Sequence, residues 1–251
     1  MVITKIFPNP TVKKVIFEAR FPNLFFIEDK IGKIQLKVMD EFPESALIFQ
    51  RQFMIVSENK EEKSKTPTPE DFGKKIWQFK SEKNYQFSVT SKSISITSDF
   101  HKTYNLGDGD KFRDIIQFVI ENFLSVISIP TFTRLGLRYI DHCPMPAKNN
   151  VTFSEYYDSV LPIERFNIAE AEELFFRTNS KKGHYNIIYM EEMRKIKNKH
   201  WLILDFDASG TKIPTEKYLK VTDELHKMIS VEYEKTIKKP VYDYMSQGRE
   251  K

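Results

Sequence analysis

TFTRLGLRYID, residues 131–141, is the stretch that indicates how the chain folds, because its side chains alternate as in a β-strand. Successive side chains of a strand point to opposite faces, so Arg134, Gly136 and Arg138 share one face. The opposite face is apolar and carries Leu135, Leu137 and Tyr139. We therefore predict a strand with one face in the core and one cationic face.

A strand of the same type opens the chain, over residues 12–21. Each of the two strands precedes a helix pattern, several further strands and a long amphipathic helix. In the first half, helices are predicted over residues 27–42 and 112–127, the second of them capped by Asp110. Strands are predicted over residues 46–56, 75–80, 85–90 and 93–98, with a polar loop over 57–75. The second half has helices over 153–160 and 215–233, strands over 172–178, 184–191 and 201–207, and a short polar tail after Pro240.

The shared order of elements predicts an α+β fold built as a pseudo-duplication. Residues 1–130 form the first β-α-β4-α half and residues 131–251 the second β-α-β3/4-α half, as two domains or one continuous domain. Two such units would pack their long helices on one side of a curved antiparallel sheet. This arrangement resembles the TATA-binding-protein-like and helix-grip architectures. Two unrelated α+β domains, or one irregular domain, are the alternatives.

The composition restricts the class of protein. Of the 251 residues, 40% are hydrophobic and 14% aromatic, which is enough for a large core and excludes global disorder. The single cysteine, Cys143, excludes a disulfide framework and fits a reducing compartment. No apolar run approaches the roughly 18 residues of a membrane helix, and no signal peptide is recognisable, so we expect a cytoplasmic protein. The net charge of +4 is weaker than nucleic-acid binders usually show.

The cationic face of residues 131–141 is the first candidate site. Two arginines on either side of a glycine leave a flat strip that can hold a carboxylate or a phosphate. If the two opening strands are neighbours, the acid and the arginine of residues 12–21 lie beside this strip. The central charge cluster then consists of Glu18, Arg20, Arg134, Gly136 and Arg138. The alternative is that the arginines pair with acids of the chain itself.

Asp205 and Asp207 share one face of the strand predicted over residues 201–207. Two carboxylates at this spacing can hold Mg²⁺ or Mn²⁺ for phosphodiester hydrolysis, or they can pair with the arginines. None of the five histidines has the spacing of a metal site. The chain also has no Walker loop, nucleophile elbow or dinucleotide-binding motif, so we expect no cofactor.

A second candidate surface interleaves lysines with aromatic residues. Basic groups can follow a phosphate backbone while aromatic rings stack on the bases. The residues concerned are Lys74, Lys75, Trp77, Lys80, Lys83 and Tyr85. The alternative is a meander whose aromatic face belongs to the core and whose lysines protect an exposed edge.

Three strand motifs also carry a resemblance to a family. They are R-L-G-L-R-Y-I at residues 134–140, V-I-F-E-A-R-F at 15–21 and L-D-F-D at 204–207. They are similar to those of a sporadically distributed family of uncharacterised prokaryotic proteins, and the resemblance covers nearly the whole chain. The family has no established activity, and its patchy distribution fits mobile genes such as phage-defence or toxin–antitoxin systems.

These features favour a non-enzymatic binding or interaction protein. Its ligand is unknown, an unidentified protein is the expected partner, and a prokaryotic defence or toxin–antitoxin system is the expected context. The first alternative is a nucleic-acid-binding component of such a system. The second is a metal-dependent phosphodiester hydrolase that uses Asp205 and Asp207. We expect no membrane association.

Overall fold

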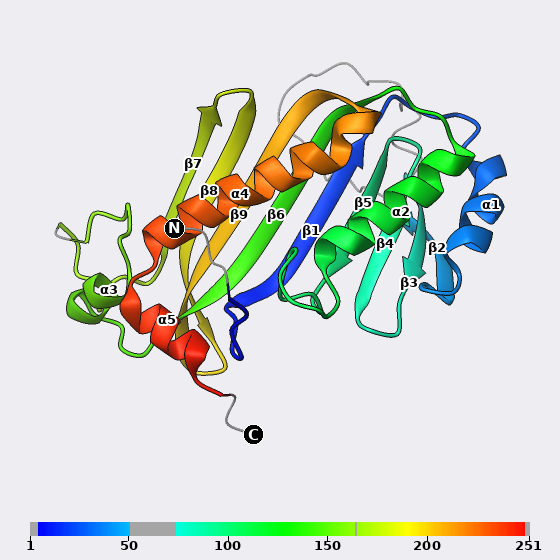
Figure 1. Ribbon diagram of the computed structural model, residues 1–251. Coiled ribbons are helices and arrows are strands. Elements are labelled where there is room, and N and C mark those ends of the chain that lie inside the picture. The colour runs from blue at the N-terminus through cyan, green and yellow to red at the C-terminus, as the bar shows by residue number, and fades with distance from the viewer. Residues whose placement is uncertain (1–4, 51–73, 164, 249–251) are drawn as a thin grey trace, which may run out of the picture.

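A sheet of nine antiparallel strands forms the framework of the protein (Figure 1). The computed structural model describes residues 5–50, 74–163 and 165–248. In these residues the strand order is β2-β3-β4-β5-β1-β6-β9-β8-β7, an open sheet. Five α-helices accompany the described strands, so the predicted α+β class is confirmed.

The helices and strands have the following bounds. The strands are β1 (Val12–Arg20), β2 (Glu44–Gln50), β3 (Lys74–Lys80), β4 (Tyr85–Val89), β5 (Ser93–Ser98), β6 (Thr131–Met145), β7 (Leu174–Lys182), β8 (Tyr185–Ile196) and β9 (Lys199–Pro214). The helices are α1 (Glu28–Val38), α2 (Phe112–Val126), α3 (Asn150–Tyr156), α4 (Tyr218–Thr236) and α5 (Lys239–Ser246). A 3-10 turn over Thr215–Lys217 leads into α4.

Strands β1 and β6, whose sequence patterns match, lie side by side at the centre of the sheet (Figure 1). They run antiparallel, with Glu18 opposite Gly136 and Arg20 opposite Arg134. Their predicted apolar faces are buried, as shown by Val15, Phe17, Ala19, Leu135 and Leu137. Because strand side chains alternate, this burial places Glu18 and Arg134 on the other face of the sheet.

The core lies between the sheet and the helices on one of its faces. Helix α4 crosses β6 and β9, and α2 crosses the first half of the sheet with α1 packed beside it (Figure 1). The apolar residues of α2 recur at three- and four-residue spacing, and those buried are Phe112, Ile116, Val119, Ile120 and Phe123. Burying one such side chain contributes roughly 1.5–3 kcal/mol, so this stripe is sufficient to hold the helix on the sheet.

No described helix covers the opposite face of the sheet, which we call the open face (Figure 1). Its central part is formed by the polar residues Glu18, Arg20, Ser93, Ser95, Thr97, Arg134, Arg138, Asp205 and Asp207 and by the aliphatic residues Ile16 and Ile140. Most of these side chains are polar, as the alternation of the strands predicts for a face without helices. The sheet thus separates an aromatic and aliphatic core from a largely polar surface.

The C-terminal tail differs from its prediction. It contains α5, and the side chains of Val241 and Met245 on this helix are buried. Pro240 stands near the start of the helix, where its missing N–H group costs nothing. Two buried side chains four residues apart are too weak a pattern to distinguish a short helix from a polar tail.

Two helix starts also differ from their predictions. The residue before α2 is Lys111, whose side chain makes no capping bond, and Asp110 instead accepts a hydrogen bond from Lys83 at 3.1 Å. Helix α3 starts at Asn150, a few residues earlier than predicted, because Asn149 caps it by accepting from the backbone N–H of Thr152 at 2.8 Å.

Part of the predicted first half lies outside the described residues. This applies to residues 51–56 of the strand predicted over 46–56 and to nearly all of the loop predicted over 57–75. None of the described helices is both long enough and apolar enough to cross a membrane.

Candidate functional site

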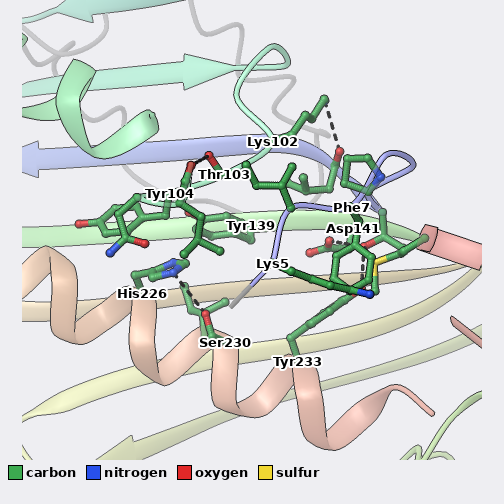
Figure 2. Close-up of a pocket in the computed structure, with 18 residues that line it drawn as sticks. Lys5, Phe7, Lys102, Thr103, Tyr104, Tyr139, Asp141, His226, Ser230 and Tyr233 are labelled. Carbon is green, nitrogen blue, oxygen red and sulfur yellow. Dashed lines mark hydrogen bonds between the residues drawn. The ribbon is translucent and has the colours of Figure 1, made fainter. Parts of the chain in front are cut away.

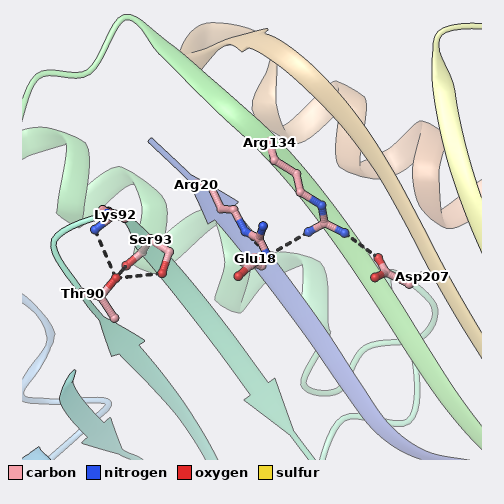
Figure 3. A network of polar contacts seen from close by, with 7 residues as sticks. All are labelled: Glu18, Arg20, Thr90, Lys92, Ser93, Arg134 and Asp207. Carbon is pink, nitrogen blue, oxygen red and sulfur yellow. Dashed lines mark hydrogen bonds and ion pairs between the residues drawn. The ribbon is translucent and has the colours of Figure 1, made fainter. Parts of the chain in front are cut away.

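The central charge cluster lies on the open face and is held by ion pairs. Arg134 bridges two strands, donating from Nη1 to Glu18 Oε2 on β1 and from Nη2 to Asp207 Oδ1 on β9, both at 2.8 Å (Figure 3). Arg20 donates to the same Glu18 oxygen at 2.9 Å. The side chain of Arg134 is 22% exposed, so these bonds are only partly screened by water.

Gly136 makes room for this bridge. A Cβ atom at residue 136 would lie 2.4 Å from Arg134 Nη1 and 2.9 Å from its Cζ. The guanidinium of Arg134 therefore lies over the glycine backbone, directly beside Glu18 in the neighbouring strand. The flat strip predicted above Gly136 exists, and a side chain of the same strand occupies it.

The second arginine makes a separate pair. Arg138 donates from Nε and Nη2 to the two oxygens of Asp205, at 2.8 and 2.5 Å, and the Asp205 side chain is only 7% exposed. This bidentate bond raises the pKa of Arg138. Glu18 and Arg138 belong to one face but do not bond to each other. Both arginines of β6 thus pair with acids of the chain, as the structural alternative expects.

The metal hypothesis needs Asp205 and Asp207 to be available together. The structure places each carboxylate against a different guanidinium, Asp205 against Arg138 and Asp207 against Arg134. Among the described residues, no group of three or more His, Cys, Asp or Glu side chains is arranged to hold a metal ion. The positive charge that a metal would supply is supplied here by arginine.

Only some lysines of the predicted nucleic-acid surface lie on the face that carries its aromatic residues. Tyr85 is buried, and the pairing of β3 with β4 places Trp77 on the same, helix-covered side of the sheet. Lys75 bonds to Glu28 of α1 at 2.6 Å, and Lys83 pairs with Asp110. Lys74 is exposed at the start of β3. Lys80, at the end of the same strand, is exposed and alternates away from Phe79.

A cavity that the sequence did not predict lies on the helix side of the sheet. It has a volume of about 120 Å³ and lies between α4, β6, the start of β1 and the loop that joins β5 to α2. We call it the α4 cavity, and its walls include Thr11, Tyr104, Tyr139, Asp141, His226 and Ser230. Figure 2 shows Tyr104 and His226 at one end and Asp141 at the other, with Tyr139 between them.

Two polar atoms in these walls lack partners. The hydroxyl of Tyr139 and Nδ1 of His226 are shielded from solvent, and no described residue is within hydrogen-bonding reach of either. Burial lowers the pKa of His226 to about 4, so the ring is neutral near pH 7. It stacks on Tyr104, with ring centroids 4.2 Å apart, and its Nε2 lies 3.4 Å from Ser230 Oγ.

A buried carboxyl group completes the cavity. Asp141 is 6% exposed and accepts a hydrogen bond from Thr11 at 2.8 Å, and Thr11 also bonds to the hydroxyl of Tyr233 at 2.6 Å. Burial raises the pKa of Asp141 from 3.8 to about 7. Burial likewise raises the pKa of the Tyr139 hydroxyl above its usual value. Perturbed groups of this kind concentrate in binding and active sites.

One signal in the sequence could have pointed to this cavity. Tyr139 lies on the predicted buried face of its strand, and Asp141 follows two residues later at the strand's predicted end. His226 falls next to the buried position Leu225 in the long C-terminal helix. Polar side chains at core positions need partners, and three of them on elements predicted to pack together indicate a polar interior.

Comparison with protein-family models, curated proteins and solved structures finds no match for this chain. The resemblance to an uncharacterised prokaryotic family therefore stays a prediction, and the functional argument depends on the geometry of the chain itself.

Proposed function

We propose that this protein binds a small molecule in the α4 cavity and acts as a binding protein. The observation that carries the proposal is the pair of unpartnered atoms, Tyr139 Oη and His226 Nδ1, on two residues that line the cavity beside the buried carboxyl of Asp141. Leaving a buried polar atom without a hydrogen bond costs about 1–3 kcal/mol. Neither atom is accessible to solvent, so a ligand in the cavity removes that cost by drawing the side chains of Tyr139 and His226 toward it.

The open face is the competing binding surface. Its charges are already paired with one another, and this favours the cavity as the binding site. Three arginines and three acids meet at its centre, and the described hydrogen bonds join each arginine to an acid. A nucleic acid needs an excess of positive charge, and this centre is balanced. We propose that the central charge cluster has a structural role, which is to hold β1, β6 and β9 in register.

We also propose that the fold is a pseudo-duplication. Each of β1 and β6 precedes a helix, a group of strands and a long helix, and the two strands are neighbours at the centre of the sheet. The position of α4 along the sheet, with a cavity beneath it, supports a helix-grip-like architecture over a TATA-binding-protein-like one.

Filling the cavity should abolish binding. We expect that the protein purified from its own cells releases a small molecule on denaturation, in an amount close to one per chain, detectable by mass spectrometry. Ser230→Leu adds bulk to the cavity wall, so this variant should release little of that compound. Ser125→Leu makes the same change on the exposed side of α2 and should release as much as the wild type.

Thermal unfolding of the variants shows whether each one is folded. Equal release from the wild type and from folded Ser230→Leu would contradict the proposal, as would a wild type that releases no compound.

A further inference from the structure

The walls of the α4 cavity are rich in hydrogen-bond acceptors. The Asp141 carboxylate receives one hydrogen bond from the described side chains, from Thr11 to Oδ1, and a carboxylate can accept several. Nδ1 of His226 accepts in the tautomer that donates from Nε2 to Ser230 Oγ, and it donates in the tautomer that accepts from Ser230 at Nε2. The oxygen of Tyr139 can accept as well. Ionised Asp141 can only accept, so a ligand that bonds to it must bring an N–H or O–H donor.

Aromatic rings surround these acceptors. The rings of Tyr104 and His226 stack at one end of the cavity, and Phe7 and Tyr233 line the other. The negative face of an aromatic ring attracts a cation, most strongly where water is excluded. Stacking covers one face of Tyr104 and one of His226, and Lys5 lies over Phe7, so a cation in the cavity depends first on the carboxylate and second on the rings.

The lysines near Asp141 do not outweigh its burial. Burial raises the pKa of Asp141 more than the charges of Lys13 and Lys102 lower it. Lys102 donates to the backbone carbonyl of Val12 at 3.3 Å (Figure 2), and it also donates to the backbone carbonyl of Asp99 at 2.6 Å. Lys5 is exposed and lies over the ring of Phe7, with Nζ 4.8 Å from the ring centroid. Asp141 therefore provides the buried charge in the cavity wall.

The volume limits the ligand to a small molecule. A cavity of about 120 Å³ is a little smaller than the engineered cavity of about 150 Å³ that holds benzene. The cavity thus accommodates a compact group of a few heavy atoms, either as a whole ligand or as the buried end of a longer one.

We propose that the ligand of the α4 cavity is a small organic cation with N–H donors, such as an alkylammonium ion, bound by Asp141 and by the surrounding aromatic rings. This inference rests on the proposed binding function and names its ligand class. A cation also stabilises the ionised form of Asp141, whose burial otherwise disfavours the charge.

Three probes of the same shape test which ligand charge the cavity prefers. tert-Butylammonium, tert-butanol and pivalate share a tert-butyl body and carry a positive, a neutral and a negative head. We expect tert-butylammonium to bind the dialysed wild type about tenfold or more tightly than tert-butanol, measured by calorimetric or NMR titration at fixed ionic strength. Pivalate should not bind, because it would place a second carboxylate beside Asp141.

Two variants test whether Asp141 causes the preference for the cation. Asp141→Asn should bind tert-butylammonium no more tightly than tert-butanol, and Asp29→Asn, on the exposed side of α1, should behave as the wild type. A preference retained by Asp141→Asn would overturn the proposal. Equal binding of the alcohol or the anion to the wild type would also overturn the cationic class.

The two proposals fail in different ways. Binding of tert-butanol or pivalate that Ser230→Leu abolishes would leave the binding function standing and remove the cation. If none of the three probes binds, the cation proposal is overturned, and the compound released from purified protein decides the binding function independently.

Discussion

Replacing Asp141 with asparagine is expected to raise the free energy of unfolding at about pH 8, by on the order of 2–4 kcal/mol. Burial raises the pKa of this carboxyl from 3.8 to about 7 in the folded protein. Each unit of pKa is worth about 1.4 kcal/mol, so the ionised group costs the folded state several kcal/mol. Asparagine has the same shape, keeps an oxygen to accept from Thr11 and carries no charge.

The gain in free energy of unfolding should increase as the pH rises. A pKa that is raised in the folded state contributes stability that is fully present below the unfolded value of 3.8 and is lost as the pH rises to about 7. The variant should therefore gain little near about pH 4 and most above about pH 7. His226 and His101 act in the opposite direction, because burial lowers each pKa to about 4 and their contribution is lost as the pH falls.

The histidines are present in both proteins, so the difference between variant and wild type isolates Asp141. Denaturant unfolding of dialysed protein at several pH values measures this difference. The exposed control Asp29→Asn should stay within about 0.5 kcal/mol of the wild type throughout. A difference for Asp141→Asn that does not change between acid and alkaline pH would show that the carboxyl does not titrate in a buried site.

Gly136→Ala is expected to lower the free energy of unfolding in the wild type and to raise it in an Arg134→Ala background. In the wild type the new Cβ atom would lie 2.4 Å from Arg134 Nη1, so the guanidinium must leave its position between Glu18 and Asp207. Losing two partly buried, charge-assisted bonds should cost about 1–2 kcal/mol. In an Arg134→Ala background this obstacle is gone, and alanine should stabilise the strand by about 0.5–1 kcal/mol over glycine.

A double-mutant cycle measures this coupling. The free energies of unfolding of the wild type, the two single variants and the double variant give an interaction energy of about 2 kcal/mol if the account is right. Gly32→Ala on α1 is the control, because a Cβ atom there meets nothing within 4 Å, and its effect should be equal in both backgrounds. Equal effects of Gly136→Ala in both backgrounds would show that Arg134 does not lie over the glycine.

Much of the fold could be predicted because alternation and helical spacing are local properties. The patterns at residues 12–21 and 131–141 placed β1 and β6, and their matching faces suggested that they are neighbours. The choice of ion-pair partners was not predictable, because it depends on register. Glu18 lies opposite Gly136, so Arg134 reaches it by folding over the glycine.

The polar interior could be suspected from the sequence, but the α4 cavity itself could not be located, because its walls come from distant segments. Thr11 stands just before β1, Asp141 lies on β6 and His226 on α4, and the three line one cavity only after the sheet and α4 have packed. The sequence shows that Tyr139 falls on a buried face, but it does not show whether the hydroxyl finds a partner. That information is three-dimensional, and it is the information on which the proposed function depends.

A crystal structure of the protein purified from its own cells would test the binding function most directly. The account predicts a small molecule in the α4 cavity, within hydrogen-bonding distance of Tyr139 Oη, His226 Nδ1 or Asp141. A cavity that holds only water molecules, or one closed by side chains that satisfy Tyr139 and His226, would contradict it.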